Sequence, residues 1–135
     1  MAWRLAIAAT AVFVALGTLA LSGKLPVSGH TYATQAQARR VALEFFRSQN
    51  DRRYEVTCRL LSVGFIRTHA LRDRQTCTGV MRVVFVWSGR IDFRIGDVTR
   101  TADRVIVHGL ADGASGRLVL VREDGALRIL AVEDD

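Results

Sequence analysis

The sequence predicts an α+β protein in which an N-terminal transmembrane or signal helix precedes about three helices packed on a curved antiparallel sheet. Three observations lead to this prediction. The chain opens with an apolar segment, hydrophobic residues then recur at helical spacing from Thr34 to about Val84, and after Gly89 they alternate with period two between glycine turns. Helices first and strands afterwards are typical of an α+β sandwich, with the helices on one face of the sheet.

Composition favours a single small domain with a basic helical half. Half of the 135 residues are apolar, and the net charge is +6. Residues 39–82 hold ten arginines against four acids, whereas residues 83–135 hold seven against nine. A segment with such an excess of arginine can bind an anionic surface, such as nucleic acid, lipid headgroups or an acidic partner. No aromatic residues interleave with the arginines and no zinc-finger spacing occurs, so we expect a solvated helix face and no nucleic-acid partner.

The first 22 residues predict a signal peptide or a transmembrane anchor. A positive start, Met1–Arg4, leads directly into residues 5–21, which carry no charge. A helix of that length spans about 26 Å, near the lower limit for crossing a bilayer and long for the apolar region of a cleaved signal. A transmembrane anchor and a cleaved signal peptide therefore both stay open as alternatives, and a buried core helix is the weaker one. We expect membrane contact through residues 3–22 and a domain outside the cytoplasmic membrane, either single-pass or secreted after cleavage.

The first helix of the domain is predicted between Thr34 and Asn50. Residues 23–33 contain the only proline of the chain and are typical of a linker, so the folded domain is expected at residues 34–135. Thr34 and Gln37 have the spacing of a capping box, in which threonine accepts from the third amide and glutamine reaches back. The apolar stripe of this amphipathic helix consists of Ala38, Val41, Ala42, Phe45 and Phe46.

A second helix is predicted with Asp51 as its N-cap, because Tyr54, Cys58 and Leu61 stand at helical spacing after it. This spacing points Cys58 inward. A third helical turn is expected to include Phe65 and Ile66.

A further helix is predicted from Asp73 to about Val84, with Asp73 as its cap and Cys77 opposite Cys58. Residues 83–87 are equally typical of a strand, and periodicity alone leaves that alternative open.

Four strands are predicted in the last third of the chain, joined by short connections that make the sheet antiparallel. The first runs through residues 91–95, where apolar and polar side chains alternate. Residues 112–116 and 123–125 have hairpin-turn chemistry, since glycine accepts positive φ. The other three strands are expected at residues 104–110, 117–122 and 126–132.

The last two predicted strands are apolar on both faces. Leucine or isoleucine on one face alternates with aliphatic residues on the other. One face must meet the helices, and the second also needs cover. We expect either a partner, meaning a second copy of the chain or an envelope protein, or cover by the linker or by the bend of the strands.

The two cysteines, Cys58 and Cys77, are predicted to form a structural disulfide. They are the only cysteines in a chain that starts with an export segment, and such a pair closes in an oxidising compartment. His69 and His108 stand at no ligand spacing from them and there is no Cys-x-x-Cys, so no metal is expected. A bond that closes about twenty residues stabilises the fold by roughly 3 kcal/mol.

Four parts of the sequence resemble a known family. They are Ala42-x-x-Phe45-Phe46, Tyr54-x-x-x-Cys58-x-Leu60-Leu61-Ser62, Cys77, and the final strands from Val121 to Ile129. Together they resemble the nuclear transport factor 2-like superfamily, in particular its small exported or membrane-anchored members common in actinobacteria. The resemblance covers residues 36–132 and departs at Leu127, where members tend to carry an aromatic residue. It implies a cone of three helices packed into a strongly bent antiparallel sheet, whose open end often forms a pocket.

Enzymes of this superfamily, such as ketosteroid isomerases and polyketide cyclases, hold an acid or base inside the cone. No catalytic dyad of theirs matches position by position, so no catalytic residue is assigned. The residues expected to line a pocket are Tyr54, His108 and Phe45. Alternatively, Tyr54 is a core residue with its hydroxyl at the rim and His108 a half-exposed strand residue, while Asp92 is expected to face solvent.

These observations together predict a non-catalytic accessory domain that needs no cofactor and binds a protein partner or a small apolar ligand. The alternative is an isomerase-like or cyclase-like enzyme that uses His108 or Tyr54 as its acid or base.

Overall fold

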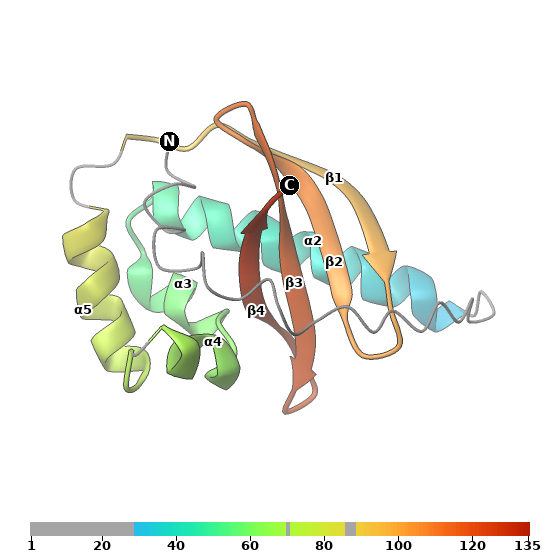
Figure 1. The fold of residues 1–135 in the computed structure, drawn as a ribbon, viewed down its shortest axis with the longest axis horizontal. Coiled ribbons are helices and arrows are strands. Elements are labelled where there is room, and N and C mark those ends of the chain that lie inside the picture. Colours follow the sequence, from blue (N-terminus) through green and yellow to red (C-terminus); the bar gives the residue numbers. More distant parts are fainter. Residues whose placement is uncertain (1–28, 70, 86–88) are drawn as a thin grey trace.

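The computed structural model describes residues 29–69, 71–85 and 89–135, which form helices followed by a four-stranded antiparallel sheet (Figure 1). The predicted α+β class is therefore confirmed. The elements are α2 (Gly29–Asn50), α3 (Tyr54–Arg59), α4 (Val63–Thr68), α5 (Arg74–Val84), β1 (Phe93–Arg100), β2 (Val105–Ala111), β3 (Ala114–Glu123) and β4 (Ala126–Asp134).

The predicted membrane segment at residues 1–22 lies outside the described residues. Among the helices that are described, none is both long and apolar enough to cross a membrane.

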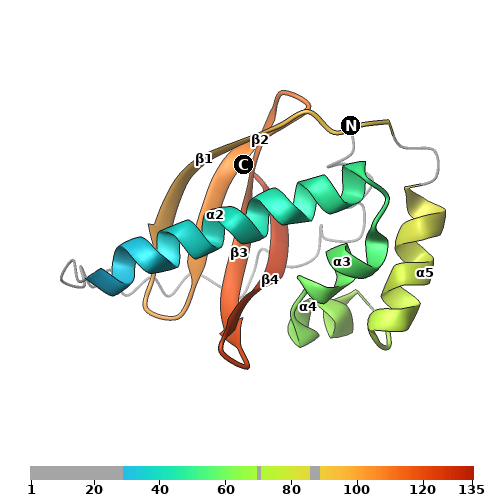
Figure 2. The same ribbon diagram turned by 180° about the vertical axis from the view of Figure 1, so that it is seen from behind.

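Helix α2 lies across one face of the sheet, and the three shorter helices gather near its C-terminal end (Figures 1 and 2). It contacts β1, β2 and β4, while α4 packs on β4 and α5 packs mainly on α3. The core forms between α2 and the sheet because the apolar stripe of α2 faces the inward side chains of all four strands. Its most deeply buried members include Ala38, Ala42, Leu61, Leu118, Leu120 and Ile129.

The strands follow one another in the order β1-β2-β3-β4, and two-residue turns connect the last three. Asp112 and Gly113 form one turn and Asp124 and Gly125 the other, with positive φ at all four residues. This is the geometry of type I′ hairpins, for which Asp-Gly is a preferred sequence. The first turn is shorter than the predicted connection at residues 112–116, because β3 already begins at Ala114.

Two register shifts let the outer strands run further than alternation alone suggests. Strand β1 continues past the predicted end at Ile95, because an irregularity between Ile95 and Val98 restores the pairing with β2. In the second shift, Val119 and Leu120 of β3 pair with Ala131 and Ile129 of β4, so the extra residue is in the outer strand β4. Bulges of this kind absorb an extra residue and bend the strand.

The start of α2 corrects the prediction for the first helix. The helix begins at Gly29, so residues 29–33 of the predicted linker are helical and Thr34 lies inside the helix. The predicted capping box at Thr34 and Gln37 is therefore wrong. No proline stands between Gly29 and Thr34 to stop the helix from extending by another turn. The Thr34 hydroxyl instead accepts a hydrogen bond from Arg122 Nη2 at 3.4 Å.

The end of α2 also differs from the prediction, since Asp51 does not cap the next helix. The Arg53 N–H donates to Ser48 O at 2.7 Å and the Arg52 N–H to Gln49 O at 3.0 Å. With Arg52 at φ 58°, this is a Schellman motif in which arginine occupies the left-handed position usually taken by glycine. The chain turns before α3 begins at Tyr54. Arg53 occupies the N-cap position of α3, and its side chain makes no capping hydrogen bond to the helix.

Side chains cap the two remaining helices. Ser62 Oγ accepts from the Phe65 N–H at 3.0 Å, which makes α4 a separate helix and gives four helices in the described residues where about three were expected. The predicted cap of α5 is confirmed, because the Asp73 carboxylate accepts from the Thr76 N–H at 2.8 Å. Val83 and Val84 belong to this helix, while residues 86–88 are outside the described part.

Two glycine substitutions should have opposite effects on stability. A Cβ at Gly109 would overlap the carbonyl oxygen of Arg94 in the neighbouring strand, whereas a Cβ at Gly79, in the middle of α5, would meet nothing within 4 Å. We expect Gly109→Ala to lower the free energy of unfolding by about 2 kcal/mol. We expect Gly79→Ala to raise it by about 1 kcal/mol. Urea unfolding followed by circular dichroism would measure both, and a tolerated Gly109→Ala would contradict the close approach of β1 and β2 at this position.

The cap of α5 should make stability depend on pH. The hydrogen bond from the Thr76 backbone N–H lowers the pKa of Asp73 below its ordinary value of 3.8. A carboxyl whose pKa is depressed on folding stabilises the native state above its unfolded pKa, and this contribution is lost as pH falls through the folded pKa. We therefore expect Asp73→Ala to destabilise the protein at neutral pH. The difference from the wild type should vanish in strong acid, as measured by urea unfolding at both pH values.

Candidate functional site

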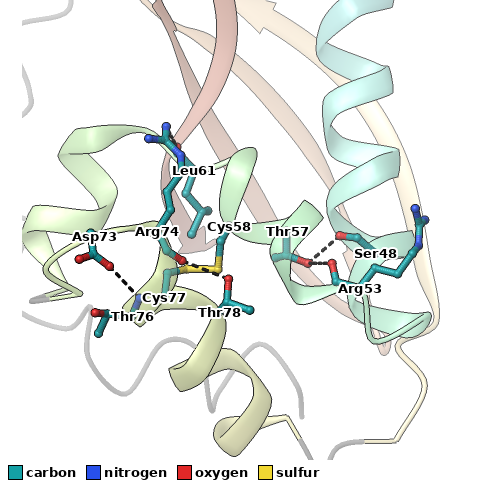
Figure 3. The surroundings of a disulfide bond; sticks show 10 residues. All are labelled: Ser48, Arg53, Thr57, Cys58, Leu61, Asp73, Arg74, Thr76, Cys77 and Thr78. Atoms are coloured by element: carbon teal, nitrogen blue, oxygen red, sulfur yellow. Dashed lines mark hydrogen bonds between the residues drawn. A yellow bond between two sulfur atoms is a disulfide. The ribbon is translucent and has the colours of Figure 1, made fainter.

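A disulfide between Cys58 and Cys77 joins α3 to α5, as predicted (Figure 3). The two Cα atoms lie 6.0 Å apart, a usual separation for this bond. Both side chains are buried, with exposed fractions of 1% and 0%. The bond thus lies inside the helical layer, away from solvent.

The end of β3 is tied to the N-terminal ends of α4 and α5. Glu123 accepts from the Val63 N–H at 3.0 Å and lies 3.7 Å from the Arg74 guanidinium. Arg74 Nη2 also donates to Leu61 O at 3.3 Å (Figure 3). One glutamate therefore connects the sheet to the first turns of α4 and α5.

A buried pair of hydroxyls connects α2 to α3. Ser48 Oγ and Thr57 Oγ1 are 2.7 Å apart, and neither residue is exposed to solvent (Figure 3). Ser48 Oγ also donates to Phe45 O at 3.0 Å. Because each hydroxyl has a partner, the pair is buried without an orphaned polar atom. The disulfide and this pair together hold α2, α3 and α5 in series.

A hollow of about 200 Å³ opens where these three helices meet the chain that enters β1. We call it the Tyr54 hollow. It is formed by the last turn of α2, the turn before α3, the end of α5 and the residues just before β1. The described residues that line it are Gln49, Asn50, Arg52, Tyr54, Phe85, Gly89, Arg90 and Ile91.

Aromatic rings and a side-chain amide build the walls of the Tyr54 hollow. The rings of Tyr54 and Phe85 stack with centroids 6.3 Å apart and an interplanar angle of 22°, and both residues are buried. Asn50 Nδ2 donates to Ile91 O at 3.0 Å, and the Ile91 N–H donates to Asn50 Oδ1 at 2.7 Å. This two-point contact fixes the chain before β1 against the end of α2.

The structure does not bring the three residues predicted to line a pocket together. Tyr54 lines the Tyr54 hollow, whereas Phe45 belongs to the core and packs edge-on against Phe46 with centroids 5.3 Å apart. His108 alternates with the core residue Val107, so it lies on the face of the sheet opposite α2. There its Nε2 is 3.2 Å from Thr99 Oγ1.

The chemistry that the hollow offers is polar and cationic. Of the described lining residues, Tyr54 carries the only hydroxyl and two carry guanidinium groups, while none is an acid or a histidine. No three described His, Cys, Asp or Glu residues lie close enough together to hold a metal ion. Asp92 is exposed, as expected from its alternation with apolar neighbours.

Sequence reasoning missed the two arginines of the hollow, Arg52 and Arg90. Neither lies on a periodic apolar stripe, and they are far apart in the chain. The sole local signal is that Arg52 follows closely after the helix end at Asn50, where a left-handed residue is common.

Comparison with known proteins does not assign this site. No model of a protein family matches the sequence, and a search of curated proteins finds no match.

Removing the disulfide should lower stability substantially. We expect Cys58→Ala/Cys77→Ala to reduce the free energy of unfolding by about 3 kcal/mol, because the bond restricts a loop of about twenty residues in the unfolded chain. Urea unfolding of the oxidised wild type, the reduced wild type and the variant would measure this. The last two should agree, and equal stability of all three would show that α5 docks without the bond.

Proposed function

We propose that this protein is a non-catalytic accessory domain, held at or released outside the cytoplasmic membrane, that binds a protein partner or a small apolar ligand. The observation that carries the proposal is the buried disulfide between Cys58 and Cys77. Structural disulfides form and persist in oxidising compartments and are rare in the cytosol. The protein would therefore act on the outer side of the membrane.

The apolar run at residues 5–21 supplies the route to that compartment, either as an anchor or as a cleaved signal. Under this proposal, the domain belongs to the nuclear transport factor 2-like superfamily, with its helices packed into a bent, cone-shaped sheet. The support is the motif resemblance, together with an antiparallel sheet that has α2 across one face.

Binding is favoured over catalysis by the residues around the Tyr54 hollow. An isomerase-like or cyclase-like enzyme needs an acid or base beside the bound substrate. Tyr54 would have to be the only acid or base at the hollow, because the other candidate, His108, lies on the sheet face opposite α2. Beside its polar and cationic groups, the hollow has an apolar part formed by the largely buried Tyr54 and Phe85, which the apolar body of a ligand would meet.

A protein partner is supported mainly by an exposed apolar surface on α5. On the sheet face opposite α2, the half-buried residues Ile106 and Ala131 flank Val119, which is 4% exposed, so that face offers less apolar surface. On α5, Val80, Val83 and Val84 are 38%, 74% and 39% exposed. Exposed apolar side chains that cluster are typical of protein interfaces. A second copy of the chain or an envelope protein would cover such surfaces.

The compartment is tested by the thiol state of the full chain in living cells. The cells are quenched in acid and the protein is unfolded before labelling, since both cysteines are buried. We expect both cysteines then to resist a maleimide reagent until a reductant is added, and a C-terminal reporter that requires export to be active. Charges placed in the apolar run, as in Val12→Arg/Leu16→Arg, should retain the protein in the cytoplasm, because arginine at the centre of such a helix is costly. That matched variant should show free thiols and an inactive reporter. Free thiols in the wild type would overturn the proposal.

A further inference from the structure

We infer that the Tyr54 hollow binds the carboxylate of a small organic acid with an aromatic or apolar body, and that Arg52 and Arg90 hold the carboxylate. This inference rests on the proposed binding function and names the class of ligand that the hollow takes.

The charges around the hollow are of one sign. Arg52 and Arg90 line it, and no described lining residue is acidic. Within the described residues, neither guanidinium takes part in an ion pair or a side-chain hydrogen bond. The acid next to Arg52 in the chain, Asp51, faces Arg53 at 3.5 Å instead. A cleft lined by one sign of charge attracts ligands of the opposite sign.

The backbones that carry the two arginines are held in place before any ligand arrives. Arg52 sits in the left-handed position of the Schellman motif, where its N–H is bonded to Gln49 O. Arg90 precedes Ile91, whose N–H and C=O are both bonded to the Asn50 side chain. Holding these residues in advance reduces the entropy lost on binding. A guanidinium fork matches the two oxygens of a carboxylate.

The ligand needs an apolar body as well as a charge, because the other wall is aromatic. Tyr54 and Phe85 both line the hollow and are 4% and 6% exposed, so their stacked rings offer a small apolar area beside the arginines. The volume of about 200 Å³ is below the range of about 300–1,000 Å³ typical of drug-sized sites. A ring with one short carboxylate arm is of suitable size, which leads to phenylacetate as the probe.

The test compares three probes by NMR on the isotope-labelled full-length chain in a non-ionic detergent. Phenylacetate has the ring and the charge, phenylacetamide has the ring alone, and acetate has the charge alone. We expect phenylacetate to shift the amide signals of Asn50, Tyr54 and Ile91, and to bind at least about tenfold more tightly than either of the other probes, since charge-assisted hydrogen bonds are the strong ones.

Two variants test the arginines, with a third as the matched control. Arg52→Gly removes the charge and suits the left-handed backbone, so it should fold. Arg90→Gln removes the second charge. Each should weaken phenylacetate binding by about tenfold or more and leave phenylacetamide unchanged. Arg47→Gln removes an exposed charge from α2 outside the hollow and should change neither.

The outcomes separate this inference from the binding function on which it rests. Equal binding of phenylacetate and phenylacetamide would overturn the carboxylate assignment and leave an apolar binding site in place. Equal binding of phenylacetate and acetate would overturn the role of the aromatic wall. If no probe shifts the three amide signals, the inference fails, while the thiol measurement still decides the compartment and the partner surfaces still stand.

Discussion

The bond between Cys58 and Cys77 is the constraint on which the helical end of the molecule depends. Cys77 is the only fully buried residue of α5, a helix that the structure describes throughout, and several valines of that helix remain exposed. Hydrophobic burial therefore contributes little to the docking of α5, which packs mainly on α3 and not on the sheet. The disulfide therefore contributes stability to the docking of α5 that its small apolar contact does not.

The Tyr54 hollow lies between helices that the disulfide joins, α3 and α5. Phe85 follows directly after α5, and Tyr54 is the first residue of α3, so the two rings meet only while these helices stay together. The opposite side of the hollow depends on the end of α2, where Asn50 binds the chain before β1. The site is thus assembled from the ends of elements rather than from the face of one element. Reduction of the bond would disturb it without any change in its lining residues.

Local signals predicted most elements but not every boundary. The Asp-Gly turns and the Asp73 cap follow from chemistry that acts over a few residues, and the cysteines could be paired because the chain has only two of them. The capping box at Thr34 failed because a good capping sequence does not start a helix where the preceding residues are able to extend it. The Asp51 cap failed because Arg52 and Arg53 complete the end of α2, and α3 starts only after them. Competing local signals of similar strength are decided by the neighbouring structure.

Sequence was sufficient for the α+β class, the amphipathic helices and the disulfide, because hydrophobic period and turn chemistry are properties of short segments. Tertiary structure alone decided which face of β2 meets the core. That strand carries apolar residues on both faces. Alternation therefore placed Val107 and His108 on opposite faces but did not determine which face points to the core. It also decided the hollow, whose residues come from four segments of the chain. Only packing determines where such ends meet, since no periodic pattern connects residues so distant in sequence.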